Sequence, residues 1–328
     1  MQPSQSSIDK TAYLYIAITS LLWSGMEVAC KYVAEQFNPL QLTFGRVFVG
    51  GMILLPFAIK SVRKKGIVLN CGAMGKFAAL GLLGVAISMT INQLAIVYAP
   101  ASVVSSRASG NPVFIALLSW LLIGEHFGRS KRLSLAFDLI GICLIIRPWD
   151  IHITVPGVIY SLLAPLTFSL YSVLSKRVCR EYGGLTTTCF CFIFGALEMM
   201  TAALLTHVPA IAEFLTAAQL ESFAYVPFFK GYTVGGIPAL LYIAVGATGI
   251  GFCCYFMAIE KSTALHASLV FFFKPILAPV YAVILLGENI SENVLAGIIC
   301  MVIGAALFAL PDLLKKPMTD GNVQKLDA

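Results

Sequence analysis

Long apolar runs are the feature that most constrains the fold of this chain. A helix needs about 20 mostly apolar residues to cross the hydrocarbon core of a bilayer. Ten segments meet this criterion: 12–33, 40–59, 77–98, 101–123, 133–148, 156–175, 187–208, 237–259, 263–286 and 293–312. Only 12% of the residues are charged, whereas soluble domains carry about 25%. The sequence therefore predicts an all-α membrane protein with ten transmembrane helices.

One of these segments occurs twice in the sequence, as an internal repeat. Residues 101–125, ASVVSSRASGNPVFIALLSWLLIGE, reappear in altered form at 264–288 as ALHASLVFFFKPILAPVYAVILLGE. Matching residues lie 163 positions apart: Pro112 and Pro275, Gly124 and Gly287, Glu125 and Glu288 (288 − 125 = 163). We expect one integral membrane domain built from two five-helix repeats, 1–150 and 151–328. Since five is odd, the second repeat enters the membrane from the opposite side, and the repeats are inverted.

The first helix of each half aligns at a smaller offset of 145, as Trp23 with Phe168 shows (168 − 23 = 145). The difference, 163 − 145 = 18, indicates 18 extra residues in the second half. The segment 209–235, between the seventh and eighth helices, is the place for them. Its residues 211–223 have helical apolar spacing, and we expect them to lie at the membrane surface as a covering segment.

Loop charges predict the orientation. With both termini in the cytoplasm, almost all the Lys and Arg residues of the loops fall on the cytoplasmic side. The other side has only Lys31, Arg147 and Lys230, which is a strong positive-inside bias. The first ten residues lack the regions of a signal peptide, so the first apolar run is expected to be retained as a helix.

The chain resembles the drug/metabolite transporter superfamily, in particular its ten-helix EamA-type permeases. The residues that carry the resemblance are Trp23-Ser24-Gly25, Lys31, Pro39, Arg46 and the Pro…Gly-Glu pattern of the duplicated segment. The resemblance implies a central cavity lined by helices one, three, four, six, eight and nine. It also implies alternating access without ATP hydrolysis by this chain, and a bacterial inner membrane as the setting. Many members are similar in having Glu-Pro in the ninth helix, where this chain has Lys274-Pro275.

Charged residues deep in apolar runs are candidate substrate ligands, because charge at the bilayer centre is costly. Arg107 and Asn111 are four residues apart and share one helix face. Lys274 occupies in the second copy the place of Asn111 in the first (274 − 111 = 163). We expect these three to meet at one cavity and to bind a carboxylate or phosphate. The alternative is that the two cations form structural pairs with Glu27 or Glu198.

Three further polar residues are candidates. Glu27 either pairs with Lys31 along its helix, or binds a substrate ammonium or the coupling proton. If both Glu27 and Lys274 contact the ligand, the substrate is a zwitterion such as an amino acid. Asn92 and Gln93 lie in the third helix, where one of them is expected to contact polar substrate groups unless both join helices together.

Aromatic residues offer walls for a ligand. Trp23 and Tyr171 lie at nearly matching positions of the first and sixth helices, and Tyr255 lies in the eighth. Packing is the more common role of aromatic residues at helical spacing.

Three other charged residues are assigned lesser roles. We expect Arg46 to pair or to extend to the outer surface, and Asp138 to reach the cytoplasmic interface. Glu198 is a possible proton site on a helix face that the sequence does not define.

These observations favour a secondary transporter for a small organic anion or zwitterion, with a proton or counter-substrate as the coupling species. An alternative is an exporter of cationic or neutral compounds that uses Glu27. A membrane-embedded enzyme is a more remote alternative, because the four His residues have no evident catalytic companions. A receptor is equally remote, because ten helices in a duplicated plan argue against it. Apart from the substrate, the bilayer is the expected partner. No metal or cofactor is expected, and the nine cysteines lack the spacing of a zinc site. Nucleic acid is not expected as a partner, because the basic residues fall in short loops that orient the helices.

Overall fold

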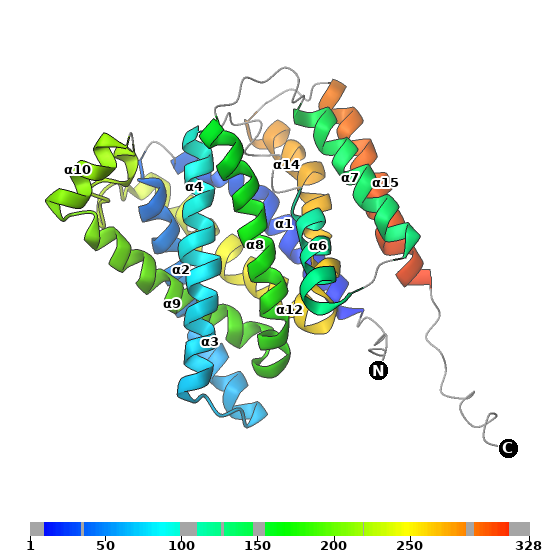
Figure 1. The fold of residues 1–328 in the computed structure, drawn as a ribbon, viewed down its shortest axis with the longest axis horizontal. Helices are drawn as coiled ribbons and strands as arrows, with labels where there is room; N and C mark the ends of the chain where they lie inside the picture. Colours follow the sequence, from blue (N-terminus) through cyan, green and yellow to red (C-terminus); the bar gives the residue numbers. More distant parts are fainter. Residues whose placement is uncertain are drawn as a thin grey trace.

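The computed structural model describes residues 10–33, 36–98, 110–125, 128–146, 155–218, 220–286 and 292–314, and this part of the chain is helical and contains no strand (Figure 1). The first half contains α1 (Thr11–Val33), α2 (Pro39–Lys65), α3 (Cys71–Gly81), the π-helical η1 (Leu82–Ile87), α4 (Ser88–Tyr98), α6 (Asn111–Ile123) and α7 (Arg129–Ile146). The second half contains α8 (Val155–Tyr182), α9 (Gly184–Leu205), α10 (Pro209–Ala217), η4 (Glu221–Phe223), η5 (Val234–Gly236), α11 (Ile237–Leu241), the π-helical η6 (Tyr242–Gly251), α12 (Phe252–Lys261), α13 (Ala264–Ala267), α14 (Val270–Leu286) and α15 (Glu292–Leu314).

Five continuous helical stretches among the described residues are long and apolar enough to cross a membrane. They are Pro39–Lys65, Cys71–Asn92, Val155–Tyr182, Gly184–Leu205 and Val234–Lys261. The predicted all-helical membrane architecture is thus present, whereas the count of ten spans remains a prediction.

Helices in the two halves have equivalent neighbours. In the first half, α1 packs against α14 and against η6 and α12; in the second, α8 packs against α6 and against η1 and α4. The helices α2 and α9 pack against each other, as do α7 and α15, which lie side by side at one edge of the molecule (Figure 1). Each half therefore supplies the partners of the other, and neither forms a separate bundle.

The same close helix crossing occurs in both halves. A Cβ atom added at Gly50 of α2 would lie 3.2 Å from the carbonyl oxygen of Ala244 in η6. A Cβ atom added at Gly195 of α9 would lie 2.9 Å from the carbonyl oxygen of Gly81 in α3. The offsets that relate the sequence copies also relate these contacts (195 − 50 = 145 and 244 − 81 = 163). Small residues let helix backbones approach closely where no hydrophobic effect drives association.

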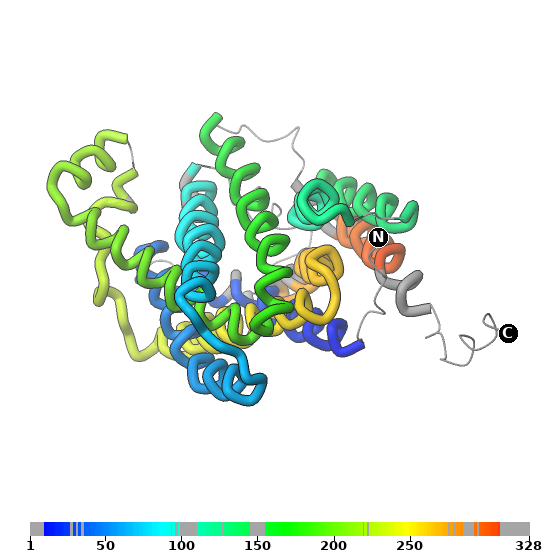
Figure 2. Tube along the Cα trace, turned by 60° about the horizontal axis from the view of Figure 1, so that its bottom comes forward, coloured from blue at the N-terminus to red at the C-terminus, as the bar shows by residue number. Residues whose placement is uncertain are grey.

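The extra segment of the second half forms two short helices, α10 and η4, and not the single helix that the sequence predicts over 211–223. It lies at the end of the molecule away from α7 and α15 (Figures 1 and 2). Its later part is fastened to the start of α2, because Gln41 Nε2 donates to the carbonyl oxygens of Phe228 (3.2 Å) and Lys230 (2.8 Å).

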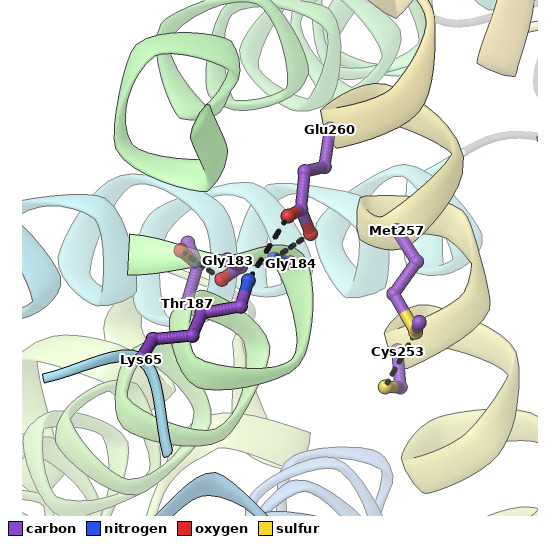
Figure 3. A network of polar contacts seen from close by, with 7 residues as sticks. All are labelled: Lys65, Gly183, Gly184, Thr187, Cys253, Met257 and Glu260. Carbon is purple, nitrogen blue, oxygen red and sulfur yellow. Dashed lines mark hydrogen bonds and ion pairs between the residues drawn. The ribbon is translucent and has the colours of Figure 1, made fainter. Parts of the chain in front are cut away.

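A carboxylate joins three helices at the other end of α2 (Figure 3). Glu260, near the end of α12, accepts a hydrogen bond of 2.6 Å from the N–H of Gly184 at the start of α9. Its second oxygen lies 3.4 Å from Nζ of Lys65, the last residue of α2. The N-terminal N–H groups of a helix have no partner within the helix, so Glu260 both satisfies one and opposes the positive end of the helix dipole.

We predict that Glu260→Ala lowers the free energy of unfolding by about 1–3 kcal/mol, since it leaves a helix N–H unsatisfied. Lys65→Ala is the matched control and is expected to cost about 0–1 kcal/mol, because the Lys65 side chain is half exposed. Thermal unfolding of the purified protein in detergent measures both. Equal losses for the two variants would contradict the assignment of the larger role to the helix cap.

We also predict that Gly195→Ala destabilises the protein by about 1–3 kcal/mol through overpacking at the helix crossing. The control is Gly75→Ala on α3, where an added Cβ would meet nothing within 4 Å. That change is expected to stabilise by up to about 1 kcal/mol, because Ala is the better helix former. Changes of opposite sign in the free energy of unfolding for Gly195→Ala and Gly75→Ala would support the close crossing. No change for Gly195→Ala would refute it.

Candidate functional site

An aromatic cluster occupies the place where α1, α8, α12 and α14 meet. Around Trp23, ring centroids lie at 5.1 Å for Tyr255, 5.8 Å for Phe271 and 6.3 Å for Phe168. The Trp23 indole N–H donates to the carbonyl oxygen of Ala247 at 3.0 Å. Both predicted aromatic residues of this cluster are buried, with Trp23 5% exposed and Tyr255 0%. The structure therefore brings them together, and their contact with a ligand remains a prediction.

Tyr171, the third predicted aromatic residue, is also fully buried on α8. Its ring lies against Gly84 of η1, so closely that a Cβ atom there would overlap the ring. Its hydroxyl has no hydrogen-bond partner among the residues that the structure describes. The neighbouring Ser172 accepts a hydrogen bond of 3.0 Å from the hydroxyl of Tyr255, which links α8 to α12.

The predicted polar site is described only in part. Asn111 begins α6 and is 5% exposed; its backbone oxygen accepts from Ser169 Oγ at 3.3 Å. The side-chain oxygen Oδ1 of Asn111 is buried and has no partner within the described residues. Lys274 and Asn92 are half-buried on α14 and α4. Arg107 and the side chains of Glu27 and Gln93 lie outside the described parts of the chain, so the convergence of Arg107, Asn111 and Lys274 stays a prediction.

Arg46 is the residue that the sequence most clearly misjudged. It does not extend to the surface, because it is only 9% exposed. Its Nη1 donates to Thr248 Oγ1 at 3.0 Å and contacts Met26 Sδ at 3.7 Å, and its Nη2 contacts Met89 Sδ at 3.6 Å. Across the residues described, no carboxylate forms an ion pair with it. Arg46 is therefore a buried cation held between α1, α4 and η6.

A cavity of about 360 Å³ adjoins Arg46 at the end of the molecule where α2 begins and α9 ends. Its walls come from α2, Met200 of α9, the loop 228–232, and the segment from α11 into η6. Six of the lining residues are aromatic: Phe37, Phe44, Phe48, Phe228, Phe229 and Tyr232. Ligand pockets typically have volumes of about 300–1,000 Å³ and mostly apolar walls with a few polar groups. This cavity has both properties.

A second, polar hollow of about 330 Å³ shares Phe37 and Gln41 with the first. Its other walls include Gln36, Asn38 and Lys230. The shared residues place the polar hollow next to the cavity that adjoins Arg46.

The structure also places Asp138 and Glu198, two further charged residues of the apolar helices. Asp138 was expected to reach the cytoplasmic interface, and this expectation is wrong, since the residue is 0% exposed on α7. Ser134 and Gly141 share its helix face, and both contact α15, through a hydrogen bond from Ser134 Oγ to Gly304 O (2.6 Å) and through the close approach of Gly141 to Met301. That face is therefore turned toward the α7–α15 interface. Glu198 is half-buried on α9.

Comparison with known proteins places this geometry in a family. The profile of the "EamA-like transporter family" matches residues 10–147 and 155–310, one match for each half. An "uncharacterized transporter" of Clostridium kluyveri is 30% identical over 306 residues, which cover 91% of this chain and 93% of that protein. Protein PecM of Dickeya dadantii is 24% identical over 74% of this chain and 75% of its own. A solved crystal structure has the same fold, with a TM-score of 0.72 at 19% identity over 92% of this chain and 98% of that one.

The apolar helices and the two matched repeats agree with the resemblance seen in the sequence, and the Clostridium kluyveri relative is named a transporter. A small-molecule substrate and a lipid bilayer are the partners that such a family implies. The chain belongs to the EamA-like transporter family, within the drug/metabolite transporter superfamily.

Proposed function

We propose that this protein is a secondary transporter that moves a small organic anion or zwitterion by alternating access. The observation that carries the proposal is the repeated helix crossing, in which Gly50 meets η6 and Gly195 meets α3 in the same register. Because the two halves have equivalent contacts, each can adopt the conformation of the other. This exchange of conformations opens a central site first to one side of the membrane and then to the other. Ten spans in two inverted repeats, 1–150 and 151–328, are the topology we assign.

The charge of the substrate is inferred from the polar groups at membrane depth. Asn111 has a buried amide oxygen without a partner in the described residues, and Lys274 on α14 supplies a cation. With Arg107, which the sequence places one helical turn before Asn111, they form the anion site that we propose. If Glu27 also contacts the ligand, the substrate is a zwitterion such as an amino acid. Export of cations or neutral compounds through Glu27 is the competing function.

The loop charges and the relatives from Clostridium kluyveri and Dickeya dadantii support the setting that we propose. We place the protein in a bacterial inner membrane with both termini in the cytoplasm, coupled to a proton or to a counter-substrate. Among Glu27, Asp138 and Glu198, any residue that carries the coupling proton must gain access to water during the cycle.

We predict that Lys274→Gln lowers the transport of the anionic substrate at least tenfold, because it removes a positive charge that no neutral amide replaces. The measurement is uptake into proteoliposomes of labelled amino acids, organic acids, sugar phosphates and amines. Lys64→Gln, at the exposed end of α2, is the matched control and is expected to change nothing. Transport of amines alone, equal in wild type and Lys274→Gln, would overturn the anion assignment and favour Glu27.

A further inference from the structure

The cavity beside Arg46 lies at a place that two aromatic rings occupy at the matching crossing of the other repeat. At the offsets found above, Gly45 corresponds to Phe190 (190 − 45 = 145) and Leu240 to Phe77 (240 − 77 = 163). Phe190 and Phe77 stack on each other, with ring centroids 5.2 Å apart and planes at 17°. In the first repeat Gly45 leaves that volume open, and both Gly45 and Leu240 line the cavity. The space therefore lies where both residues of the matching aromatic pair are replaced, Phe190 by Gly45 and Phe77 by Leu240.

The charge is also confined to one repeat. Arg46 corresponds to Cys191 (191 − 46 = 145), and its neighbour Thr248 corresponds to Val85 (248 − 85 = 163). Cys191 and Val85 are both fully buried in the apolar core. The scaffold thus closes around this position without a cation, so packing alone does not require the guanidinium of Arg46.

The environment of Arg46 suits an anionic ligand. A guanidinium has five N–H donors. Among the described residues, the partners of Arg46 are one hydroxyl and two thioether sulfurs, which are weak acceptors. A buried cation without an acidic partner is costly, and a carboxylate compensates it best because it can accept two parallel hydrogen bonds. Within the described residues no acid takes this role.

The walls and the entrance define the rest of the ligand. Phe44 and Phe48 of α2, and Phe228 of the covering loop, present apolar rings to the cavity. Apolar cavities of about 150 Å³ hold benzene, so about 360 Å³ accommodates a ring-sized body. The adjoining polar hollow carries Lys230 at its wall, which favours the entry of an anion from water.

We propose that this cavity is a binding site for a water-soluble organic anion, whose carboxylate contacts Arg46 and whose ring-sized apolar body packs against the aromatic walls. In the transport cycle the substrate occupies this site at the end of the bundle where α2 begins. This assignment extends the proposed function and rests on it. Alignment of the two sequence copies does not reveal this site, because the site lies at positions where the copies differ.

Binding of benzoate to the purified full-length protein tests the site, with benzyl alcohol and benzylamine as the neutral and cationic ligands of the same shape. The readouts are isothermal titration calorimetry and the ligand-induced rise in melting temperature. We expect wild type to prefer benzoate over both analogues at least tenfold. Gly45→Phe fills the cavity with the residue found in the other repeat, and we expect it to weaken benzoate binding at least tenfold. Gly75→Phe, at an open position of α3, is the matched control and is expected to bind like wild type.

Arg46→Gln is expected to abolish the preference for benzoate over benzyl alcohol. If that variant fails to fold, Gly45→Phe still decides the question. Equal binding of the three ligands, or benzoate binding unaffected by Gly45→Phe, would overturn the site, as would Arg46-dependent stabilisation by an anionic phospholipid without any effect of benzoate.

Transport measurements keep the two proposals apart. If Gly45→Phe and Arg46→Gln leave anion uptake unchanged, the transporter assignment stands and the cavity is not a substrate site in the transport cycle. Benzoate binding that depends on Arg46 in a protein that moves no anion would keep the site and overturn the proposed function.

Discussion

Backbone contact between glycine-bearing helices is the constraint on which this structure depends. In a bilayer the lipid is as apolar as the side chains, so close van der Waals packing replaces the hydrophobic effect as the force between helices. Gly50 and Gly195 allow α2 and α9 to approach η6 and α3 at matching points. The aromatic cluster around Trp23 and the cap that Glu260 provides to α9 complete a frame in which the helices of each half contact those of the other.

A duplicated frame makes differences between its halves informative. Where Gly45 stands against Phe190 and Arg46 against Cys191, the same backbone borders a cavity with a cation at its wall in one repeat and a filled, neutral core in the other. Positions that pack alike in both repeats are explained by stability. Positions that differ in volume and charge need another reason, and the ligand site that we propose would supply one.

Rotation of the helices explains why the sequence misjudged some side chains. Arg46 lies seven residues into α2, near enough to the end for a long side chain to reach the interface, yet its side chain turns inward to Thr248. Asp138 was placed at the interface for the same reason and is enclosed at the side of α15. A helix that is apolar on all faces carries little information about which face points inward, because the pattern of polar residues that would set it is missing. Trp23 and Tyr255 lie on two of the helices that the resemblance places around a central cavity, and the structure brings their rings together.

The sequence by itself determined the helical membrane architecture, the duplication and the family, because each depends on hydrophobicity and spacing summed over many residues. It also indicated where the copies differ, in Lys274 against Asn111. Only the tertiary structure showed three features of the region around α2: the space beside Gly45, the buried position of Arg46 and the loop that lines the same cavity. These depend on the rotation and separation of α2, η6 and α9, which are set by contacts between residues about 200 positions apart, such as Arg46 with Thr248 (248 − 46 = 202). Hydrophobic pattern fixes which segments enter the membrane, and packing fixes what they enclose.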